Sequence, residues 1–473
     1  MPSLKWCVVS LSEVVGRGKR LEAGVFDVEA RSARTIIENG KYSLSTICGA
    51  DGFASAYVGG RFKRIWVKKS DCPIYQPSEI VNVRPLPDGW LSRKTKADLD
   101  SLRVRKGQIL LTCSGTIGKA ALVSDTLDGK IFSHDLLRID CKDKRDVGYV
   151  YTYLKCHIGN KILLTNGYGA VITHIEPEHL LSVPVPKAPQ EVRRRINDLI
   201  CKSYALRDES NALIDKAEAL LRDELKLPPI DGFKVKFFGR DAGVDTFSVK
   251  LGRLEGRIDA SYHVPIVDAI VSHLNKHADE IATVADPRVS KEVILPGRFK
   301  RVYVGEGYGT PFFSGRSIGE IDPSDKKYLS FAQHQKRIMT QLTIRANMIL
   351  VTCSGAIGNV AFAPRHWDGW TMTHDIIRIV PNGRMAGFTY IWLQSAWART
   401  LIFAKAYGAV VQHIDKTHIL SIPVPLSKDG AVQGEINRLA LAANEKRFEA
   451  YKLEQKALDV MEREVLHVGS AKT

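Results

Sequence analysis

The sequence predicts a mixed α/β (α+β) chain in which two tandem globular domains, related by an internal repeat, are separated by long helices. The repeat is the first observation: Tyr168–Pro186 returns as Tyr407–Pro425 with twelve of nineteen residues identical. Ile109–Ala120 likewise returns as Ile349–Val360. The second observation is that short β-branched runs between Gly and Pro residues fill each copy, and the third is a long helical pattern after each copy.

The repeat period of about 240 residues is that of a domain, because solenoid repeats are only about 20–50 residues long. A shared Arg-Leu-Glu at Arg20 and Arg253 is expected to mark the front of each copy. We expect a first domain over 1–187, a central long helix over 188–227, a linker over 228–250, a second domain over 251–426 and a distal long helix over 427–467, before a disordered tail.

In the first domain, β-branched content and flanking turns predict strands at RFKRIWVKK, GQILLTCSG, KAALVSD and LLRIDC. Tyr149–Leu164 is predicted to be one helix. Pro184, Pro186 and Pro189 are expected to end the domain, since proline cannot continue a central strand.

The two long helices are predicted from apolar or small residues at alternating spacings of three and four. The first begins with Pro189 at its first turn, is free of Gly and Pro, and is ended by Leu227-Pro228-Pro229. Its seam positions are 196, 199, 203, 206, 210, 213, 217 and 220, and those of the second helix, over 431–467, are 436, 439, 443, 450, 453, 457 and 460. The simplest partner of each helix is the other, in an antiparallel coiled coil that gives the halves a pseudo-twofold relation.

Charge separates the helices from the domains. The chain has a net charge of +16, but Lys187–Lys226 holds nine basic and eight acidic residues and Ser427–Leu466 seven and eight. The excess therefore lies mainly in the domains, which favours a polyanionic partner over a membrane. The apolar runs fall short of the ~20 residues of a membrane span. The eight scattered cysteines, with no Cys-x-x-Cys, indicate a reducing cytoplasm and no metal site.

The Ile-Leu-x-Thr-Cys-Ser-Gly-x-Ile-Gly runs at 109 and 349 and the Tyr-Gly-Ala-Val-x-x-His-Ile runs at 168 and 407 resemble the specificity subunit of a Type I restriction-modification system. Arg257–Tyr262 resembles the start of a recognition domain in that family. The resemblance implies two target-recognition domains that each bind one half of a split double-stranded DNA sequence, and helices that fix the gap. It implies a non-catalytic chain that binds no cofactor. Methyltransferase subunits would bind S-adenosylmethionine, and a separate restriction subunit would use ATP and Mg.

Segments shared by the two copies should contact what all DNA has in common, whereas divergent segments should carry sequence recognition. The repeated Gly-Arg-Phe-Lys-Arg therefore supplies candidate phosphate contacts, with a solvated turn as the alternative; they are Arg61, Lys63, Arg64, Arg298, Lys300 and Arg301. The copies differ most at 65–108 and 302–348. Candidate base or groove contacts there are Arg84, Arg93, Lys94, Lys96, Arg316, Lys326, Lys327, Lys336 and Arg337.

Two repeated loops have two interpretations each. Tyr168 and His174, with Tyr407 and His413, fit either a loop on the DNA backbone or a structural turn held by Gly169 and Gly408. The glycines of the Cys-Ser-Gly loops (Gly115, Gly118, Gly355 and Gly358) fit either a phosphate-binding loop or a tight turn between strands.

The main alternatives are a hydrolase and an interaction scaffold that uses the coiled coil alone. Ser114, His134 and Asp135 have the residue types of a catalytic triad, repeated at Ser354, His374 and Asp375, and Cys113 and Cys353 are possible nucleophiles. Neighbouring His and Asp on one strand should point to opposite faces, which argues against a triad. The sequence contains neither a Gly-rich cofactor fingerprint nor a Walker loop.

Overall fold

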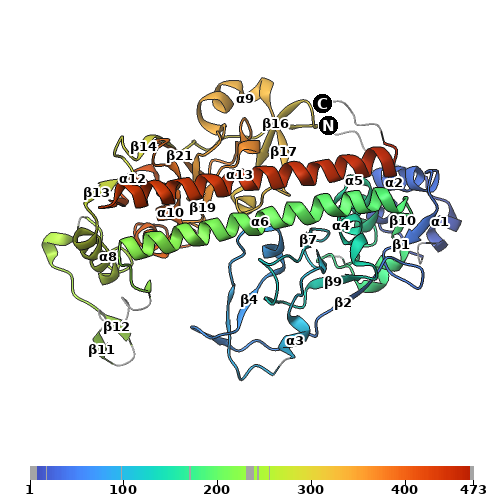
Figure 1. The fold of residues 1–473 in the computed structure, drawn as a ribbon, viewed down its shortest axis with the longest axis horizontal. Coiled ribbons are helices and arrows are strands. Elements are labelled where there is room, and N and C mark those ends of the chain that lie inside the picture. Colours follow the sequence, from blue (N-terminus) through green and yellow to red (C-terminus); the bar gives the residue numbers. More distant parts are fainter. Residues whose placement is uncertain are drawn as a thin grey trace. The chain divides into compact units, whose positions relative to one another are not determined.

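The computed structural model describes residues 8–16, 19–96, 98–169, 172–230, 239–241, 244–254 and 256–468. The chain forms two compact units, unit 1 with residues 1–208 and 449–473 and unit 2 with residues 209–448 (Figure 1). Part of the predicted linker, 231–238, and most of the predicted tail, 469–473, lie outside the described residues. No helix in the described ranges is both long enough and apolar enough to cross a membrane.

Unit 1 contains a four-stranded antiparallel sheet in the order β2-β9-β6-β7. Its strands are β2 (Ala54–Val58), β6 (Ile109–Thr112), β7 (Ala120–Leu122) and β9 (Leu136–Cys141). Every residue of β6 is buried, because Ile109 and Leu111 face the helical side of the core while Leu110 faces a second cluster around Ile80. A sheet covered on both faces has continuous apolar strands, which explains the ILLT and LLRI runs.

A second, smaller sheet in unit 1 has the order β3-β5-β4-β8. It is built from β3 (Trp66–Val67), β4 (Pro73–Tyr75), β5 (Gly89–Leu91) and β8 (Ile131–Phe132), with β8 parallel to β4. Three of its four strands fall in the divergent segment 65–108. Only Trp66–Val67 of the predicted strand RFKRIWVKK is a strand, because residues 61–65 cross from one sheet to the other.

The helices of unit 1 are α1 (Leu11–Gly16), α2 (Val28–Glu38), α3 (Leu99–Leu102), α4 (Val147–Lys155) and α5 (His157–Leu164). Three of them (α2, α4 and α5) pack with the first sheet in one core, α3 packs on the small sheet, and α1 has no buried residue. The prediction of one helix over Tyr149–Leu164 is wrong, since Cys156 is extended (ψ 154°) and its Sγ accepts a hydrogen bond from Gly159 N (3.4 Å). β10 (Pro184–Pro186) pairs with β1 (Leu44–Thr46) in a two-stranded sheet, so its prolines lie on an edge strand.

Unit 2 repeats this architecture. Its main sheet has the order β14-β21-β18-β19 and its small sheet the order β15-β17-β16-β20. The strands are β13 (Glu280–Thr283), β14 (Ser290–Ile294), β15 (Tyr303–Val304), β16 (Gly309–Phe313), β17 (Lys327–Ser330), β18 (Ile349–Thr352), β19 (Val360–Phe362), β20 (Thr371–Met372), β21 (Ile376–Pro381) and β22 (Pro423–Leu426). The helices are α8 (Pro265–His277), α9 (Phe331–Arg337), α10 (Ala386–Gln394), α11 (Ala396–Ala404) and α12 (Lys416–Leu420). A short hairpin, β11 (Gly239–Asp241) with β12 (Val244–Thr246), precedes them.

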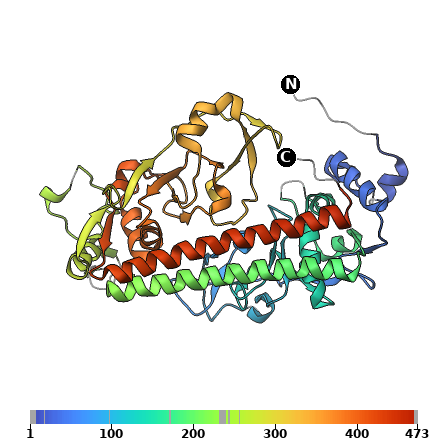
Figure 2. The same cartoon turned by 45° about the horizontal axis from the view of Figure 1, so that its top comes forward.

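The predicted long helices are α6 (Gln190–Glu224) and α13 (Gly430–Val460), the latter continued by a π-turn over Met461–Val465. In each unit a part of α6 runs antiparallel to a part of α13 (Figure 2). In unit 1, Ser203 Oγ donates to Ala450 O (2.7 Å). In unit 2, Arg447 Nε donates to Ser210 Oγ (3.0 Å), and Lys446 pairs with Glu209. The predicted antiparallel coiled coil is thus present within each unit.

The buried seam of α6 differs in part from the predicted one. Ile196, Ser203, Ser210 and Ala217 are fully buried, whereas the predicted seam positions 199, 206, 213 and 220 are only half-buried. A second buried stripe (Ile200, Tyr204, Ile214, Leu221 and Leu225) faces the sheet domain of the same unit. The helix therefore buries two faces. One packs against α13, and the other packs against the hydrophobic core of each unit.

An asparagine near the start of each long helix binds the backbone of a short helix, α4 in unit 1 and α10 in unit 2. Asn197 Oδ1 accepts a hydrogen bond from Gly148 N (2.8 Å), at the start of α4. Asn437 Oδ1 accepts one from Gly387 N (2.7 Å), at the start of α10. A Cβ on Gly387 would lie 2.4 Å from Asn437 O, so only glycine allows this close approach.

Candidate nucleic-acid interface

The repeated basic segment of unit 1 lies where the chain crosses between its two sheets. β2 leads through residues 59–65 to β3, and β8 leads through residues 133–135 to β9. Because Val58 pairs with Leu137 in the antiparallel β2–β9 ladder, the two crossings must leave the sheet side by side. We call residues 59–65 with 133–135 the junction of unit 1, and residues 295–302 with 373–375 the junction of unit 2.

The alternation of Gly-Arg-Phe-Lys-Arg decides which cations reach solvent. Phe62 packs on the cluster of Ile74, Leu91 and Ile131, while Arg61 and Lys63 on the other side are exposed. Arg64 shares the inward side with Phe62 and is half-buried. Within the described ranges, none of these three cations forms an ion pair, so the junction carries a net positive charge even with Asp135 included.

Unit 2 builds the same arrangement. Phe299 packs on Phe312 and Leu329, and Arg298 and Lys300 are exposed. Arg301 is half-buried and its Nη2 donates to Thr373 Oγ1 (3.1 Å). The structure thus brings the six candidate phosphate contacts to equivalent places, three in each junction.

A histidine–aspartate pair lies in each junction. His134 Nε2 is 3.4 Å from Asp135 Oδ1, and His374 Nε2 is 3.3 Å from Asp375 Oδ1. The expectation that the two side chains point to opposite faces is wrong, because both residues lie in the bend before β9 or β21 and not within the strand. Burial lowers the pKa of His134, against the effect of Asp135 and with that of Arg61 and Arg64. Burial likewise lowers the pKa of His374, against the effect of Asp375 and with that of Arg301 and Arg298.

The repeated Tyr-Gly-Ala-Val loops are closed by backbone pairing. Tyr168 N and His174 O lie 3.0 Å apart, and His174 N and Tyr168 O 2.7 Å apart. Tyr407 and His413 pair identically. Gly408 has φ +103°, and a Cβ there would lie 2.3 Å from Val411 O. These contacts favour the structural interpretation of Tyr168, His174, Tyr407 and His413, although Val410 at the loop tip is 97% exposed.

The Cys-Ser-Gly loops are tight turns. Gly115, Gly118, Gly355 and Gly358 have φ between +70° and +87° and join β6 to β7 or β18 to β19. Gly115 N donates to Thr173 O (3.0 Å) and Gly118 N to Thr112 O (3.0 Å). In unit 2, Gly355 N donates to Gln412 O (3.0 Å) and Gly358 N to Thr352 O (2.9 Å). These N–H groups are satisfied by the protein and leave no donor for a phosphate.

The front of the second domain is Arg257 and not Arg253. Arg20 Nη2 donates to Gly167 O (2.7 Å), just after α5. Arg257 Nη2 donates to Ala406 O (2.7 Å), just after α11. The match of Arg-Leu-Glu at Arg20 and Arg253 is therefore coincidental, and RLEAGVF in unit 1 stands where RIDASYH stands in unit 2.

In unit 1 the divergent candidates surround β5. Arg93 forms an ion pair with Asp71 (Nη2 to Oδ2, 2.6 Å). Lys94 and Lys96, directly after it, are exposed, and Arg84, before β5, is half-buried. Lys94 and Lys96 are therefore more accessible to a ligand than Arg84.

In unit 2 the divergent candidates fall into two groups. Lys326 is bound to Asp322 (2.7 Å) and stacks on Trp370, and Arg337 Nη1 donates to Gly297 O (3.0 Å). Arg337 thus holds the start of the basic segment in place. Arg316, Lys327 and Lys336 are exposed.

Sequence reasoning missed one buried arginine in each unit. Arg138 Nη2 donates to Leu102 O (2.9 Å), and Arg378 Nη2 donates to Met372 O (2.7 Å) and Leu342 O (3.3 Å). Both side chains are fully buried, and burial lowers the pKa of Arg378 to about 9. They tie the end of the divergent segment to the main sheet. The signal was an arginine within each repeated apolar run, LLRI and IIRI.

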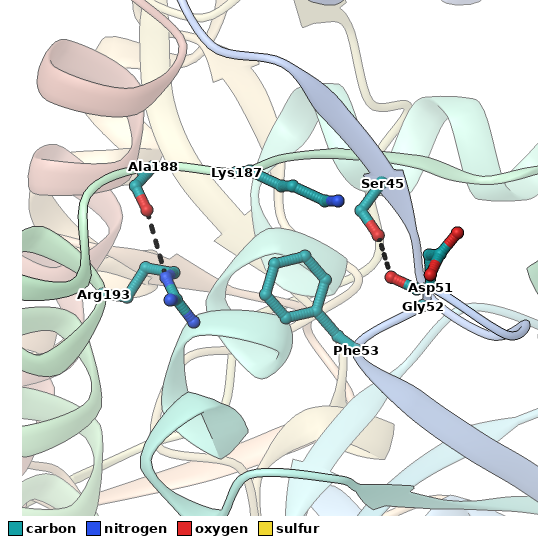
Figure 3. Close-up of a pocket in the computed structure, with 7 residues that line it drawn as sticks. All are labelled: Ser45, Asp51, Gly52, Phe53, Lys187, Ala188 and Arg193. Carbon is teal, nitrogen blue, oxygen red and sulfur yellow. Dashed lines mark hydrogen bonds between the residues drawn. The ribbon is translucent and has the colours of Figure 1, made fainter.

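Unit 1 also has a small pocket at the opposite end of β2 from the junction (Figure 3). It is lined by Ser45, Asp51, Gly52, Phe53, Lys187, Ala188 and Arg193 and has a volume of about 270 Å³. Ser45 Oγ donates to Asp51 O (2.6 Å), and Arg193 pairs with Asp146. Ser45 and Arg193 are thus both held by hydrogen bonds to neighbouring protein groups.

The two repeated thiols, Cys113 and Cys353, are buried. The described residues contain no cluster of three or more His, Cys, Asp or Glu that could hold a metal ion. Burial raises the pKa of the Cys113 thiol to about 11 and that of Cys353 to about 12. Such thiols are protonated near neutral pH and are poor nucleophiles.

The fold and the junctions define a class of protein: a duplicated chain that presents one basic inter-sheet junction per unit. No family model and no curated protein matches the sequence. Solved structures do match it. A Type I restriction-modification S subunit from M. genitalium is 14% identical, with a TM-score of 0.34, over 90% of this chain and 96% of its own. An HsdS subunit from Thermoanaerobacter tengcongensis is 12% identical, with a TM-score of 0.26, over 88% and 97%. A chain from a structure of the assembly of a type I R-M system is 14% identical, with a TM-score of 0.26, over 91% and 98%.

Proposed function

We propose that the chain is the DNA-specificity subunit of a restriction-modification complex, in which each unit recognises one half of a two-part DNA sequence. The observation that carries the proposal is the duplicated junction. Arg61 and Lys63, like Arg298 and Lys300, are exposed cations joined directly to a small sheet whose sequence differs between the units. Shared cations suit phosphates, which every DNA presents, and divergent sheets suit base edges.

The long helices are proposed to set the gap between the half-sites and to bind methyltransferase subunits. In this proposal the chain does no chemistry. The methyltransferase subunits bind S-adenosylmethionine, a restriction subunit uses ATP and Mg, and the complex works on double-stranded DNA in the cytoplasm. The sequence resemblance and the nearly neutral charge of the helices support this division of roles.

The test is to coexpress the chain with its methyltransferase subunits and to map methylated motifs in the host genome. Exchanging residues 65–108 for the matching segment of another recognition domain should change one half of the motif and leave the other unchanged. A change in both halves would contradict separate recognition by the two units.

A binding assay separates this function from an interaction scaffold. Arg61→Gln/Lys63→Gln should weaken binding to every DNA sequence and reduce the slope of log K against log salt by about two, one per lost phosphate contact. Lys428→Gln removes an exposed cation outside both junctions and serves as the control. A scaffold without DNA contacts predicts no salt-dependent binding by any of the three proteins.

A further inference from the structure

In unit 2, three consecutive residues, Thr373, His374 and Asp375, form a polar cluster that holds Arg301, and we call this cluster the relay. Thr373 Oγ1 donates to Asp375 Oδ2 (3.1 Å), and His374 Nε2 lies 3.3 Å from Asp375 Oδ1. Arg301 Nη2 lies 3.1 Å from Thr373 Oγ1 and 3.2 Å from His374 Nδ1. Asp375 therefore contacts both groups that hold the arginine.

The chemistry of the groups fixes the direction of each hydrogen bond. A carboxylate can only accept and a guanidinium can only donate. Because Nδ1 of His374 faces the Arg301 guanidinium, it must be the acceptor, and the neutral imidazole carries its proton on Nε2, on the side of Asp375. The Thr373 hydroxyl likewise gives its proton to Asp375 and accepts from Arg301. Asp375 is thus hydrogen-bonded to one acceptor, Thr373, and in contact with the other, His374.

The relay leaves part of Arg301 available for a ligand. Its guanidinium lies over the Phe312 ring (5.4 Å to the centroid), and Nη2 is held by Thr373 and His374. Nη1 makes no hydrogen bond to any residue that the structure describes. Ordering an arginine side chain costs rotamer entropy, so a guanidinium that is already fixed loses less entropy when it binds an anion.

Unit 1 has the equivalent residues and the histidine–aspartate contact, but its serine is not bonded to the aspartate and its arginine lies elsewhere. His134 Nε2 is 3.4 Å from Asp135 Oδ1. Ser133 Oγ and His134 Nδ1, the equivalents of the two acceptors, are buried and have no hydrogen-bond partner. Arg64, the equivalent of Arg301, lies over the Trp66 ring (5.9 Å to the centroid). Unpaired buried acceptors are costly, and a guanidinium from Arg64 would satisfy both.

We propose that the relay positions the last arginine of each Gly-Arg-Phe-Lys-Arg segment for a DNA phosphate, and that it is engaged in unit 2 and disengaged in unit 1. This inference rests on the proposed function. His374 and Asp375 are positioning residues, since they act through Arg301. The unit 2 half-site meets a guanidinium that is already in place, whereas Arg64 must be ordered when the unit 1 half-site binds.

The experiment measures binding of a 40-bp fluorescent duplex to the full-length chain at several salt concentrations. Arg301→Gln and His374→Phe should each weaken binding about tenfold, the loss of one charge-assisted hydrogen bond. Each should also lower the salt slope by about one. The double variant should bind no worse than Arg301→Gln alone. His374→Asn keeps an acceptor near the Nδ1 position and should restore most of the affinity.

The outcomes separate the two proposals. If the wild-type chain shows no salt-dependent binding, the proposed function fails. If the wild type binds, Arg301→Gln binds weakly and His374→Phe is unchanged, only the relay fails. It also fails if the losses multiply in the double variant, as they would for a purely structural histidine. Urea unfolding midpoints identify variants that do not fold. If His374→Phe does not fold, the DNA affinities of His374→Asn and Arg301→Gln are compared instead: the relay requires that His374→Asn bind more tightly than Arg301→Gln.

His134→Phe is the matched variant in unit 1. Because no arginine is docked there, it should weaken binding less than His374→Phe does. Equal losses would contradict the assignment of an engaged relay to unit 2 and a disengaged one to unit 1.

Discussion

Arg207 and Glu454 form a buried ion pair between α6 and α13 in unit 1, with Nη2 and Oε2 2.9 Å apart. Glu454 also accepts from the Tyr151 hydroxyl (2.5 Å) and pairs with Lys155 (2.9 Å). The carboxylate is fully buried and therefore depends on these three partners. The repeat equivalent of Arg207 is Arg447, which instead donates to Ser210 Oγ.

This cluster predicts a loss of stability in acid. Burial acts to raise the pKa of Glu454, but the charges of Arg207 and Lys155 overcome it and leave a pKa of about 2, against 4.5 for an ordinary glutamate. A lowered folded-state pKa stabilises the protein above the unfolded-state value, and the stabilisation is lost as pH falls from about 4.5 toward 2. Urea unfolding followed by circular dichroism between pH 7 and pH 3 measures this loss.

The control is Arg207→Met/Glu454→Leu, which replaces the ion pair by apolar side chains. Its urea midpoint should fall less steeply below pH 4.5 than that of the wild type. Parallel curves would show that Glu454 does not titrate abnormally.

Close packing of α10 on α13 predicts a second effect. In Gly387→Ala the new Cβ would lie 2.4 Å from Asn437 O and 2.9 Å from Ala440 Cβ. We expect a loss of about 1–3 kcal/mol in unfolding free energy, as for other overpacked sites. Gly383→Ala, whose Cβ would meet nothing within 4 Å, should change stability by less than about 0.5 kcal/mol. Equal urea midpoints for the two variants would contradict the contact.

Thiol reactivity tests the hydrolase alternative. Cys201 is exposed, whereas Cys113 and Cys353 are buried and their pKa values are raised by burial to about 11 and about 12. Iodoacetamide at pH 8 should label Cys201 in the native chain and should leave Cys113 and Cys353 unlabelled until urea is added. Peptide mass spectrometry gives the result, and Cys201→Ser is the control. Rapid native labelling of Cys113 would favour a nucleophilic thiol.

The proposed spacer role predicts that helix length changes the DNA gap. A seven-residue insertion in α6 before Leu227, with a matched insertion in α13, preserves the heptad pattern and adds about 10 Å of helix. Methylated motifs should then contain the same two half-sites at a different separation. A single seven-residue insertion in the region after β12 lengthens the chain without lengthening a helix and serves as the control. An unchanged gap in the helix variant would contradict the spacer role.

The repeat made much of the fold predictable. A strand such as Ile109–Thr112 has a short apolar run that its repeat confirms, and α6 has no Gly or Pro between its ends. The small sheets were harder, because strands of two or three residues such as Trp66–Val67 carry too short a pattern. Cys156 illustrates another limit, since a break between two helices depends on one backbone angle at a residue with no helix-breaking signature.

The site was predictable in composition but not in its contacts. The repeat identified Arg61 and Arg298 as shared cations, and the strand alternation explains their exposure. The pairing of His374 with Asp375 was not predictable, because it depends on a bend that the sequence suggested was strand. The ion pair of Arg93 with Asp71 joins residues 22 positions apart and has no local sequence signal.

Because unit 1 is built from two separate segments of the chain, its folding during synthesis differs from that of unit 2. Unit 2 is one continuous segment, 209–448, whereas unit 1 needs residues 449–473 in addition to 1–208. Ala457, Val460 and Met461 belong to the unit 1 core. During synthesis unit 1 therefore cannot complete its core until residues 449–473 have been translated, although its first 208 residues emerge earlier. Unit 2, in contrast, can fold from its own continuous segment.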